Sequence, residues 1–393
     1  MLERLDWLII GGGVHGTLLS RFLTGAAGVP RERLRVLDPH EDPLARWDHC
    51  TANTGMEFMR SPSVHHLDVE SFSVRRFTQY VGEETMRFAP PYHRPHLEVF
   101  RAHCAHVIEA HDLRGLRLQG SAHGLERKTG YWEVETDRGC VHAEHVVLAM
   151  GASDHLGYPD WVSPRLKPRV QHLFDPDFDR TLIAPEEDVA IVGCGISAAQ
   201  LALALANRPE GSGGVTVFTR RKVYTRQFDI DPGWLGPRYL ARFQREPSMV
   251  ERRSKIRAAR GVATIPPEIW RAVRRARHAE QVEWLRAEVA KAELDSHGRL
   301  QVTFTNGSRA FDRLVLATGF VRTCPRPSWL DRTIETLDLP LAPCGYPIVD
   351  DALAWAPGLH VTGPLAELVI GPAARNIAGA RMAASRLTAH ARA

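Results

Sequence analysis

Lysine is scarce in this chain. The 393 residues contain 5 lysines against 45 arginines, and 46 acidic residues leave a formal net charge of +4. Acidic residues are interspersed among the arginines along the whole chain, so the arginine excess does not indicate a nucleic-acid-binding face. We predict no nucleic-acid partner.

Long apolar runs are also absent, since none approaches the about 20 residues needed to span a bilayer. The first apolar strand begins near the start of the sequence, which leaves no room for a cleavable signal peptide. We therefore expect no membrane partner and a cytoplasmic location. With 44% hydrophobic residues, the chain is long enough to bury two cores.

The six cysteines are scattered and include no Cys-x-x-Cys pair. A redox-active dithiol needs two thiols within bonding reach. The sequence therefore does not favour a disulfide reductase, and isolated thiols suit a reducing compartment.

Glycine, in contrast, occurs in a repeated pattern. Residues 11–16 read Gly-Gly-Gly-Val-His-Gly and residues 193–198 read Gly-Cys-Gly-Ile-Ser-Ala, each after a short apolar run and before a helix-like stretch. Such a turn brings backbone close to a pyrophosphate, which then lies at the helix N-terminus. Two turns predict two dinucleotide sites, with contacts from Gly11, Gly13 and Gly16 in the first and from Gly193, Gly195, Ser197 and Ala198 in the second.

The residue that ends the next strand distinguishes the two sites. Asp38 follows Gly16 at the same spacing at which Arg220 follows Ala198, and Arg221 comes directly after Arg220. A carboxylate accepts hydrogen bonds from ribose hydroxyls, as the adenosine of FAD or NAD requires. A guanidinium binds a 2′-phosphate, which indicates NADPH at the second site. The alternative, that both arginines are ordinary surface residues, stays open.

A second repeat follows each fingerprint. Alternating polar and apolar residues predict a β-meander, and continuous apolar runs predict buried strands that end at Gly151 and Gly319. The meander strands are expected at 117–119, 131–136 and 141–142, and again at 300–305, with the buried strands at 146–151 and 314–319.

These motifs resemble the two-dinucleotide-binding flavoproteins, and in particular the flavin-dependent N-hydroxylating monooxygenases, the lysine and ornithine N-hydroxylases. The resemblance reaches the chain end, where 358–364 is similar to a last FAD-domain strand and 371–380 to a helix start facing the flavin. It implies an α/β fold with two Rossmann-like (three-layer ββα) domains, the NADPH domain inserted into a discontinuous FAD domain.

The resemblance also implies domain boundaries. The first part of the FAD domain is expected at 1–165, the NAD(P)H domain at 166–324 and the C-terminal part of the FAD domain at 325–393. Within the second domain, about 231–294 reads as a helical insertion with basic helices near 252–257, 270–277 and 282–289. This insertion is either a peripheral packing element, a cap over the substrate entrance or a dimer contact.

The segment 46–68 reads as irregular and resembles the stretch that lines the flavin ring in the N-hydroxylases. Asp48 separates the Trp from the His, and the family's proline after that His is absent. The resemblance implies FAD contacts from Trp47, His49, Gly151, Gly363, Asn376 and Ile377, an NADPH contact from Gly319, and candidate catalytic roles for Asn53, Met56 and Arg60. The alternative is a structured loop that covers FAD.

Histidines crowd the stretch 93–111, where Leu97 to Ile108 predict an amphipathic helix with His103 and His106 at the margins of its apolar stripe. The separations between these histidines along the chain do not match those of a zinc-ligand motif. We therefore predict no metal site.

The resemblance implies an enzyme, a FAD-containing, NADPH-dependent oxidoreductase. As a monooxygenase it would use a C4a-(hydro)peroxyflavin to hydroxylate a small soft nucleophile, an amine nitrogen or a sulfur. Two alternatives remain: an NAD(P)H-dependent flavin reductase that passes electrons to a carrier or quinone, and a non-catalytic FAD-binding sensor. The expected partners are a small-molecule substrate and O₂, and the oligomeric state is left open, a homo-oligomer included.

Overall fold

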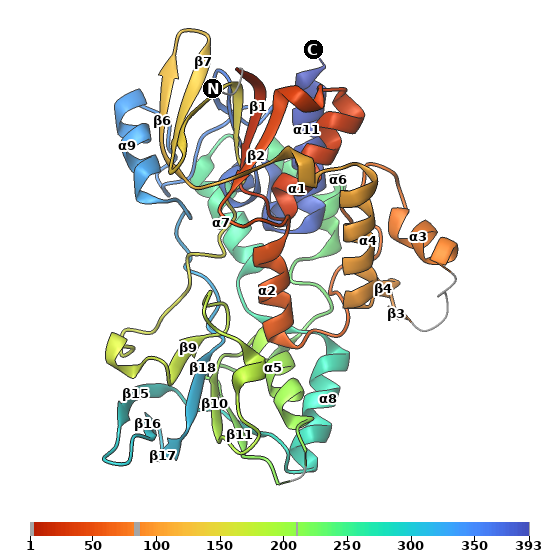
Figure 1. The fold of residues 1–393 in the computed structure, drawn as a ribbon. Helices are drawn as coiled ribbons and strands as arrows, with labels where there is room; N and C mark the ends of the chain where they lie inside the picture. The colour runs from red at the N-terminus through yellow and green to blue at the C-terminus, as the bar shows by residue number, and fades with distance from the viewer. Residues whose placement is uncertain (1–3, 82–86, 210, 393) are drawn as a thin grey trace.

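The computed structural model describes residues 4–81, 87–209 and 211–392. A mixed sheet and a parallel sheet, each with its own helices, form an upper and a lower domain in Figure 1, with both chain ends in the upper one. The predicted α/β class is confirmed, including the return of the chain to the first sheet after the second is complete.

The upper domain is built around a sheet in the order β19-β20-β8-β1-β2-β5. Strand β1 runs parallel to both neighbours, β2 and β8, and β20 adds parallel to β8 at Val146–Leu148. The strands of this sheet are β1 (Leu5–Ile10), β2 (Leu34–Asp38), β5 (Arg117–Gln119), β8 (Gly139–Leu148), β19 (Ala354–Ala356) and β20 (Leu359–Val361).

The predicted first meander is correct in two of its three strands. An additional strand, β6 (Ala122–Lys128), pairs with β7 (Tyr131–Thr136), which pairs with β8. Residues 117–119 form β5 instead, hydrogen-bonded in parallel to β2. The expectation for that strand is wrong because backbone pairing with Val36–Asp38 extends the parallel sheet, a long-range contact that alternation does not reveal.

The lower domain has a fully parallel sheet in the order β14-β11-β10-β18-β9 and a separate antiparallel meander. The parallel strands are β9 (Val170–His172), β10 (Val189–Val192), β11 (Val215–Phe218), β14 (Glu283–Leu285) and β18 (Arg313–Leu316). The meander strands are β15 (Val289–Leu294), β16 (Leu300–Phe304) and β17 (Gly307–Phe311).

The segment 231–294, expected to form a helical insertion, contains α6 (Pro237–Gln244), α7 (Met249–Arg260) and α8 (Pro267–His278). Helix α8 packs on α5 (Ile196–Ala206) of the lower domain. The expected helix at 282–289 is wrong, because Glu283–Leu285 pairs with β11 and the chain then enters β15. Strand β12 (Tyr224–Thr225), which precedes α6, pairs with β13 (Thr264–Ile265), which lies between α7 and α8 in the chain.

The remaining helices belong to the upper domain. In Figure 1, α1 and α11 lie side by side, and α2 extends from the upper domain toward the lower one. These helices are α1 (Val14–Phe22), α2 (Ala45–Thr54), α3 (Ser73–Val81), α4 (Leu97–Ala110), α9 (Ser328–Leu337), α10 (Glu367–Ile370) and α11 (Ile377–Ala391), with the short strands β3 (Phe88–Ala89) and β4 (Arg94–Pro95) beside α4.

Helix α2 corrects the expectation of an irregular segment at its start. It ends at Gly55, whose φ of +68° provides the left-handed cap that glycine adopts without steric cost. Beyond Gly55 the chain runs in turns and isolated bridges, as expected. Among the described residues, no helix is both long and apolar enough to cross a membrane.

Candidate nucleotide-binding sites

The first glycine turn follows β1 and begins α1. At Gly11, with φ +111°, a Cβ would lie 2.5 Å from the carbonyl oxygen of Ala149, and at Gly16 it would lie 1.8 Å from that of Gly11. Both positions therefore exclude any side chain. A Cβ at Gly13 would meet nothing within 4 Å, so open space lies before the turn where a pyrophosphate could approach the backbone.

Asp38, at the end of β2, is held beside this turn. Its Oδ2 accepts a hydrogen bond from the Gly12 N–H (2.6 Å) and its Oδ1 accepts one from the His40 N–H (3.0 Å). Burial alone raises the pKa of Asp38, but these hydrogen bonds, the His40 ring and the charge of Arg117 outweigh it and lower the pKa below its usual value. Asp38 is thus an ionised acceptor at the position expected for a ribose contact.

Arg117 is a site residue that the sequence does not reveal. Its guanidinium fills the space next to Gly12, where a Cβ would lie 1.7 Å from Nη1, and its Nη2 lies 3.3 Å from Asp38 Oδ1. The Nε and Nη1 of Arg117 are buried and have no partner within the protein. Two unpaired N–H groups at the turn suit a phosphate or ribose oxygen of a bound dinucleotide. The alternation of polar and apolar residues predicts that 117–119 is a meander strand, and from that prediction no contact between Arg117 and Asp38 would be expected.

His15 is a second residue that the spacing does not single out. Its Nδ1 lies 2.8 Å from Thr362 Oγ1, at the end of β20, and its buried Nε2 has no partner. Burial lowers the pKa of His15 to about 4, so the ring is neutral at pH 7. It joins the turn to Gly363, whose Cβ position would lie 3.7 Å from the His15 ring.

The second glycine turn follows β10 and begins α5. A Cβ at Gly193 would lie 2.5 Å from the carbonyl oxygen of Ala317, and the Gly193 N–H donates to the Phe218 carbonyl at 3.0 Å. No side chain caps the N-terminus of α5 at Gly195, so its first N–H groups, including that of Ser197, suit an anion. Ala198 is fully buried, the packing role expected of the third position.

Arg220 and Arg221 follow β11 and are exposed. The Arg220 Nη1 lies 3.6 Å from Glu288 Oε1, and both side chains are largely exposed. Exposed pairs of this kind contribute little, so Arg220 can exchange its partner for a phosphate at small cost. The register of β10 and β11 brings the residues after Phe218 beside the second glycine turn.

Two residues expected to contact FAD or act in catalysis bond to the segment between β9 and β10. The Asn53 amide donates to the Phe178 carbonyl (2.7 Å) and accepts from the Arg180 N–H (3.0 Å). His49 donates from Nε2 to the Asp175 carbonyl (2.8 Å). The catalytic role expected for Asn53 and the FAD contact expected for His49 stay predictions.

The Arg60 side chain reaches from the upper domain to the short β12–β13 pair and the residues that directly follow β12. Its Nε donates to the Gln227 carbonyl (2.8 Å), and its Nη2 donates to the Arg226 carbonyl (3.0 Å) and to Thr264 Oγ1 (2.7 Å). Burial lowers the pKa of Arg60 to about 10. The guanidinium is thus engaged by two backbone carbonyls and one hydroxyl, and the catalytic role expected for Arg60 stays a prediction.

Four more of the predicted site residues are Trp47, Met56, Gly151 and Gly319. Trp47 and Met56 pack against the upper core, with the Trp47 ring 5.4 Å from that of Phe100. Gly151 and Gly319 lie just beyond the ends of β8 and β18, and their φ values of +71° and +79° are in the left-handed region.

At the start of α11, Asn376 is the N-cap residue, and its Oδ1 lies 3.4 Å from Arg260 on α7. Ile377 is buried in the first turn of the helix. The cofactor contacts expected of both residues stay predictions.

The expected position of His103 is wrong. It is fully buried rather than marginal, with Nε2 2.8 Å from Ser73 Oγ, because α3 packs over α4 on that side. Among the described residues, the histidines of 93–111 form no group of three metal-ligating atoms.

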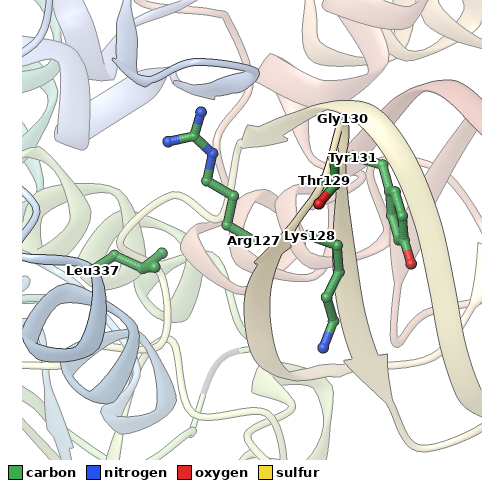
Figure 2. Close-up of a pocket in the computed structure, with 6 residues that line it drawn as sticks. All are labelled: Arg127, Lys128, Thr129, Gly130, Tyr131 and Leu337. Carbon is green, nitrogen blue, oxygen red and sulfur yellow. The ribbon is translucent and has the colours of Figure 1, made fainter.

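A surface hollow of about 880 Å³ lies between the β6–β7 hairpin and α9. Figure 2 shows Arg127 extending on the side of Leu337, while Lys128 and Tyr131 extend from the hairpin in other directions. None of the residues lining this hollow belongs to either glycine turn or to the segments that connect the two domains, so we place no nucleotide there.

Comparison with known proteins gives a family. The family model described as L-lysine 6-monooxygenase/L-ornithine 5-monooxygenase matches residues 123–322. No curated protein matches the chain in sequence.

Solved structures share the fold over nearly the whole chain. A FAD-bound cadaverine monooxygenase from Erwinia amylovora has a TM-score of 0.77 at 14% identity, covering 99% of this chain and 94% of its own. The ornithine hydroxylase of Pseudomonas aeruginosa has a TM-score of 0.75 at 14% identity, and the match covers 99% of this chain and 98% of the hydroxylase. The L-lysine 6-monooxygenase of Pseudomonas syringae scores 0.72 at 18% identity, covering 99% of both.

Proposed function

The chain belongs to the L-lysine 6-monooxygenase/L-ornithine 5-monooxygenase family, and from this premise we propose that it hydroxylates the terminal nitrogen of a small primary amine, using NADPH and O₂ with FAD bound. The family resemblance inferred from the glycine turns is confirmed by the family model, and the chain is a flavin-dependent monooxygenase. The observation that carries the proposal is that one fold contains two glycine turns, here called cradles, with the acidic Asp38 beside the first and the basic Arg220 beside the second.

The first cradle fits FAD. Gly11 and Gly16 exclude side chains, Gly13 leaves open space, and Arg117 presents two buried N–H groups without partners. We assign the pyrophosphate to the Gly11–Gly16 turn, the adenosine ribose to Asp38 and an adjacent oxygen to Arg117. FAD, when bound, supplies the redox chemistry that couples NADPH oxidation to insertion of one oxygen atom of O₂ into the substrate.

The second cradle fits NADPH. We assign its pyrophosphate to the turn at Gly193–Gly195 with the N-terminus of α5, and its 2′-phosphate to Arg220 with Arg221. Arg60 and Asn53, which bond across the domain boundary, hold the two cradles in a fixed relation. Their role in this proposal is to orient the two nucleotides for hydride transfer and to limit the entry of water between the domains.

Amines of the ornithine, lysine and cadaverine type are the substrates named for the similar structures, and we propose a substrate of that class. An unprotonated primary amine is the soft nucleophile that this oxygen insertion requires. We further propose that O₂ is the co-substrate, that the protein acts in the cytoplasm, and that the domain boundaries lie near 165 and 324.

The test combines oxygen consumption with product analysis. Purified protein with FAD and NADPH is incubated with ornithine, lysine, cadaverine and a thioether such as methionine, and hydroxylamine or sulfoxide products are measured by mass spectrometry. We expect a hydroxylamine from at least one amine, formed in step with NADPH oxidation. Sulfoxide alone would move the substrate class to sulfur. Reduction of quinones or protein carriers without any oxygenated product would overturn the proposal in favour of a reductase.

A further inference from the structure

Three histidines from distant parts of the sequence meet in the upper domain, away from both glycine turns. His145 lies in β8, His360 in β20 and His390 in the last turn of α11. One ring nitrogen from each lies within 4.8 Å of the others. His145 pairs with Trp7 in the middle of β1, whereas the nucleotide turn begins beyond the end of that strand, at Gly11.

The spacing of the two inner histidines matches a metal site. His145 Nδ1 lies 3.3 Å from His360 Nε2. Tetrahedral zinc with Zn–N bonds of about 2.0–2.1 Å separates two ligand nitrogens by about 3.3–3.4 Å. The third histidine, His390, is exposed on the final helical turn, so its side chain can rotate to close the remaining gap.

The two inner rings are held in place by stacking. The Trp7 indole stacks on His145 with ring centroids 4.4 Å apart and on His360 with centroids 5.5 Å apart. Two of the three ligand rings therefore have fixed positions on the sheet.

The donor set selects the class of ion. Three imidazoles suit zinc and related divalent transition metals and not calcium or magnesium, which take oxygen ligands. A surface hollow of about 560 Å³ lined by His390, Asp351 and Arg386 gives access from solvent, so a fourth position can be filled by water.

We propose that His145, His360 and His390 bind one divalent transition metal ion, with zinc as the expected occupant, and that this site fastens the C-terminal helix to the central sheet. The sequence predicts no metal site because these three histidines are widely separated along the chain and form no short ligand motif. Bound zinc then ties α11 to β8 and β20, two strands that already pair with each other, and adds to the packing of α11 on α1.

The test uses the FAD-loaded full chain without an affinity tag, treated with chelator and dialysed, and Zn²⁺ alone as the probe. Isothermal titration and elemental analysis should give one zinc per chain, and zinc should raise the melting temperature. His390→Gln changes an exposed residue, so it should fold normally and lower zinc affinity at least about tenfold, since loss of even an outer partner of a ligand costs about 10–100-fold. His123→Gln, at an exposed histidine of β6, is the matched control and should bind as wild type.

Cobalt provides a second readout. Co²⁺ bound at this site should show the visible absorption bands of a four-coordinate ion, at longer wavelength than the flavin bands, and His145→Gln should abolish them. Equal zinc binding by wild type and His390→Gln would overturn the proposal. Absence of stoichiometric zinc, or a six-coordinate cobalt spectrum unaffected by His145→Gln, would do the same.

Discussion

The side-chain amide of Asn53, on α2 of the upper domain, bonds both the carbonyl of Phe178 and the N–H of Arg180, two backbone groups in the segment between β9 and β10. Only 4% of Asn53 is exposed. A buried amide that satisfies backbone groups of the other domain holds the two domains together at this point, and its removal leaves those groups unpaired.

We expect Asn53→Ala to lower the free energy of unfolding by about 1–3 kcal/mol, because buried hydrogen-bonding groups lose their partner. FAD retention should be unchanged, since the FAD cradle lies elsewhere, while reduction of the flavin by NADPH should slow. Urea unfolding, the flavin-to-protein absorbance ratio and anaerobic stopped-flow reduction measure the three effects. Unchanged stability with loss of hydroxylation alone would instead indicate that Asn53 contacts the reactants.

Arg117→Met should weaken FAD binding while leaving the fold intact. The substitution keeps an apolar stem and removes the N–H groups that face the first glycine turn. Loss of a charge-assisted hydrogen bond costs about 1.5–3 kcal/mol, or roughly 10- to 150-fold in Kd. Titration of the apoprotein with FAD, followed by flavin fluorescence, gives the value. An unchanged Kd would mean that Arg117 serves only Asp38 and the His40 carbonyl.

Arg220→Ala should raise the KM for NADPH and leave the KM for NADH nearly unchanged, because only NADPH carries the 2′-phosphate. The expected loss is again roughly 10- to 150-fold. Flavin reduction rates with each nucleotide, in wild type and variant, measure it. Arg165→Ala, at an exposed arginine outside both turns, is the control and should behave as wild type. Equal losses with both nucleotides would place Arg220 at the pyrophosphate or in folding, and a wild-type preference for NADH would overturn the NADPH assignment.

Stability should fall as the pH is lowered from about 6.5 toward 4. Burial, with the neighbouring His66, lowers the pKa of His103 to about 3 from its usual 6.5, so the unfolded chain binds a proton that the folded chain does not. The free energy of unfolding therefore does not depend on His103 above pH 6.5. Below that pH it falls by up to about 1.4 kcal/mol per pH unit for one such group.

The variant His103→Gln places an amide near Ser73 without a titrating ring. Its unfolding free energy should depend less steeply on pH between 6.5 and 4, even if its value at pH 7 is reduced. Urea unfolding at several pH values gives the slope, with His297→Gln, at an exposed histidine, as the control. An identical slope in His103→Gln and wild type would show that His103 is not a source of the acid sensitivity.

Features set by neighbouring residues along the chain are predictable from this sequence. Both glycine turns, the acid at 38 and the helices at 97–108 and 252–257 depend on local spacing, and the structure has them there. Predictions fail where a partner distant in sequence decides. A helix is expected at 282–289, but Glu283–Leu285 within this segment pairs with β11 as a strand.

The same distinction applies within the site. Asp38 is recognisable because it lies at a fixed spacing from its glycines, whereas Arg117 reaches the same turn from β5, a strand much later in the chain. Analogy assigns Asn53 to the flavin face, but its partners at 178–180 depend on how the domains meet. No spacing within the upper domain contains that information.

The position of β20 beside β8 determines the order in which this protein can be completed. Strand β8 ends at Leu148 and β20 begins at Leu359, so the whole inserted domain must be synthesised before the two strands can pair. At roughly 5–20 residues per second this takes tens of seconds, during which Val146–Leu148 presents an apolar strand edge on the ribosome. The inserted domain therefore emerges and can fold first, and the domain that surrounds it is closed last.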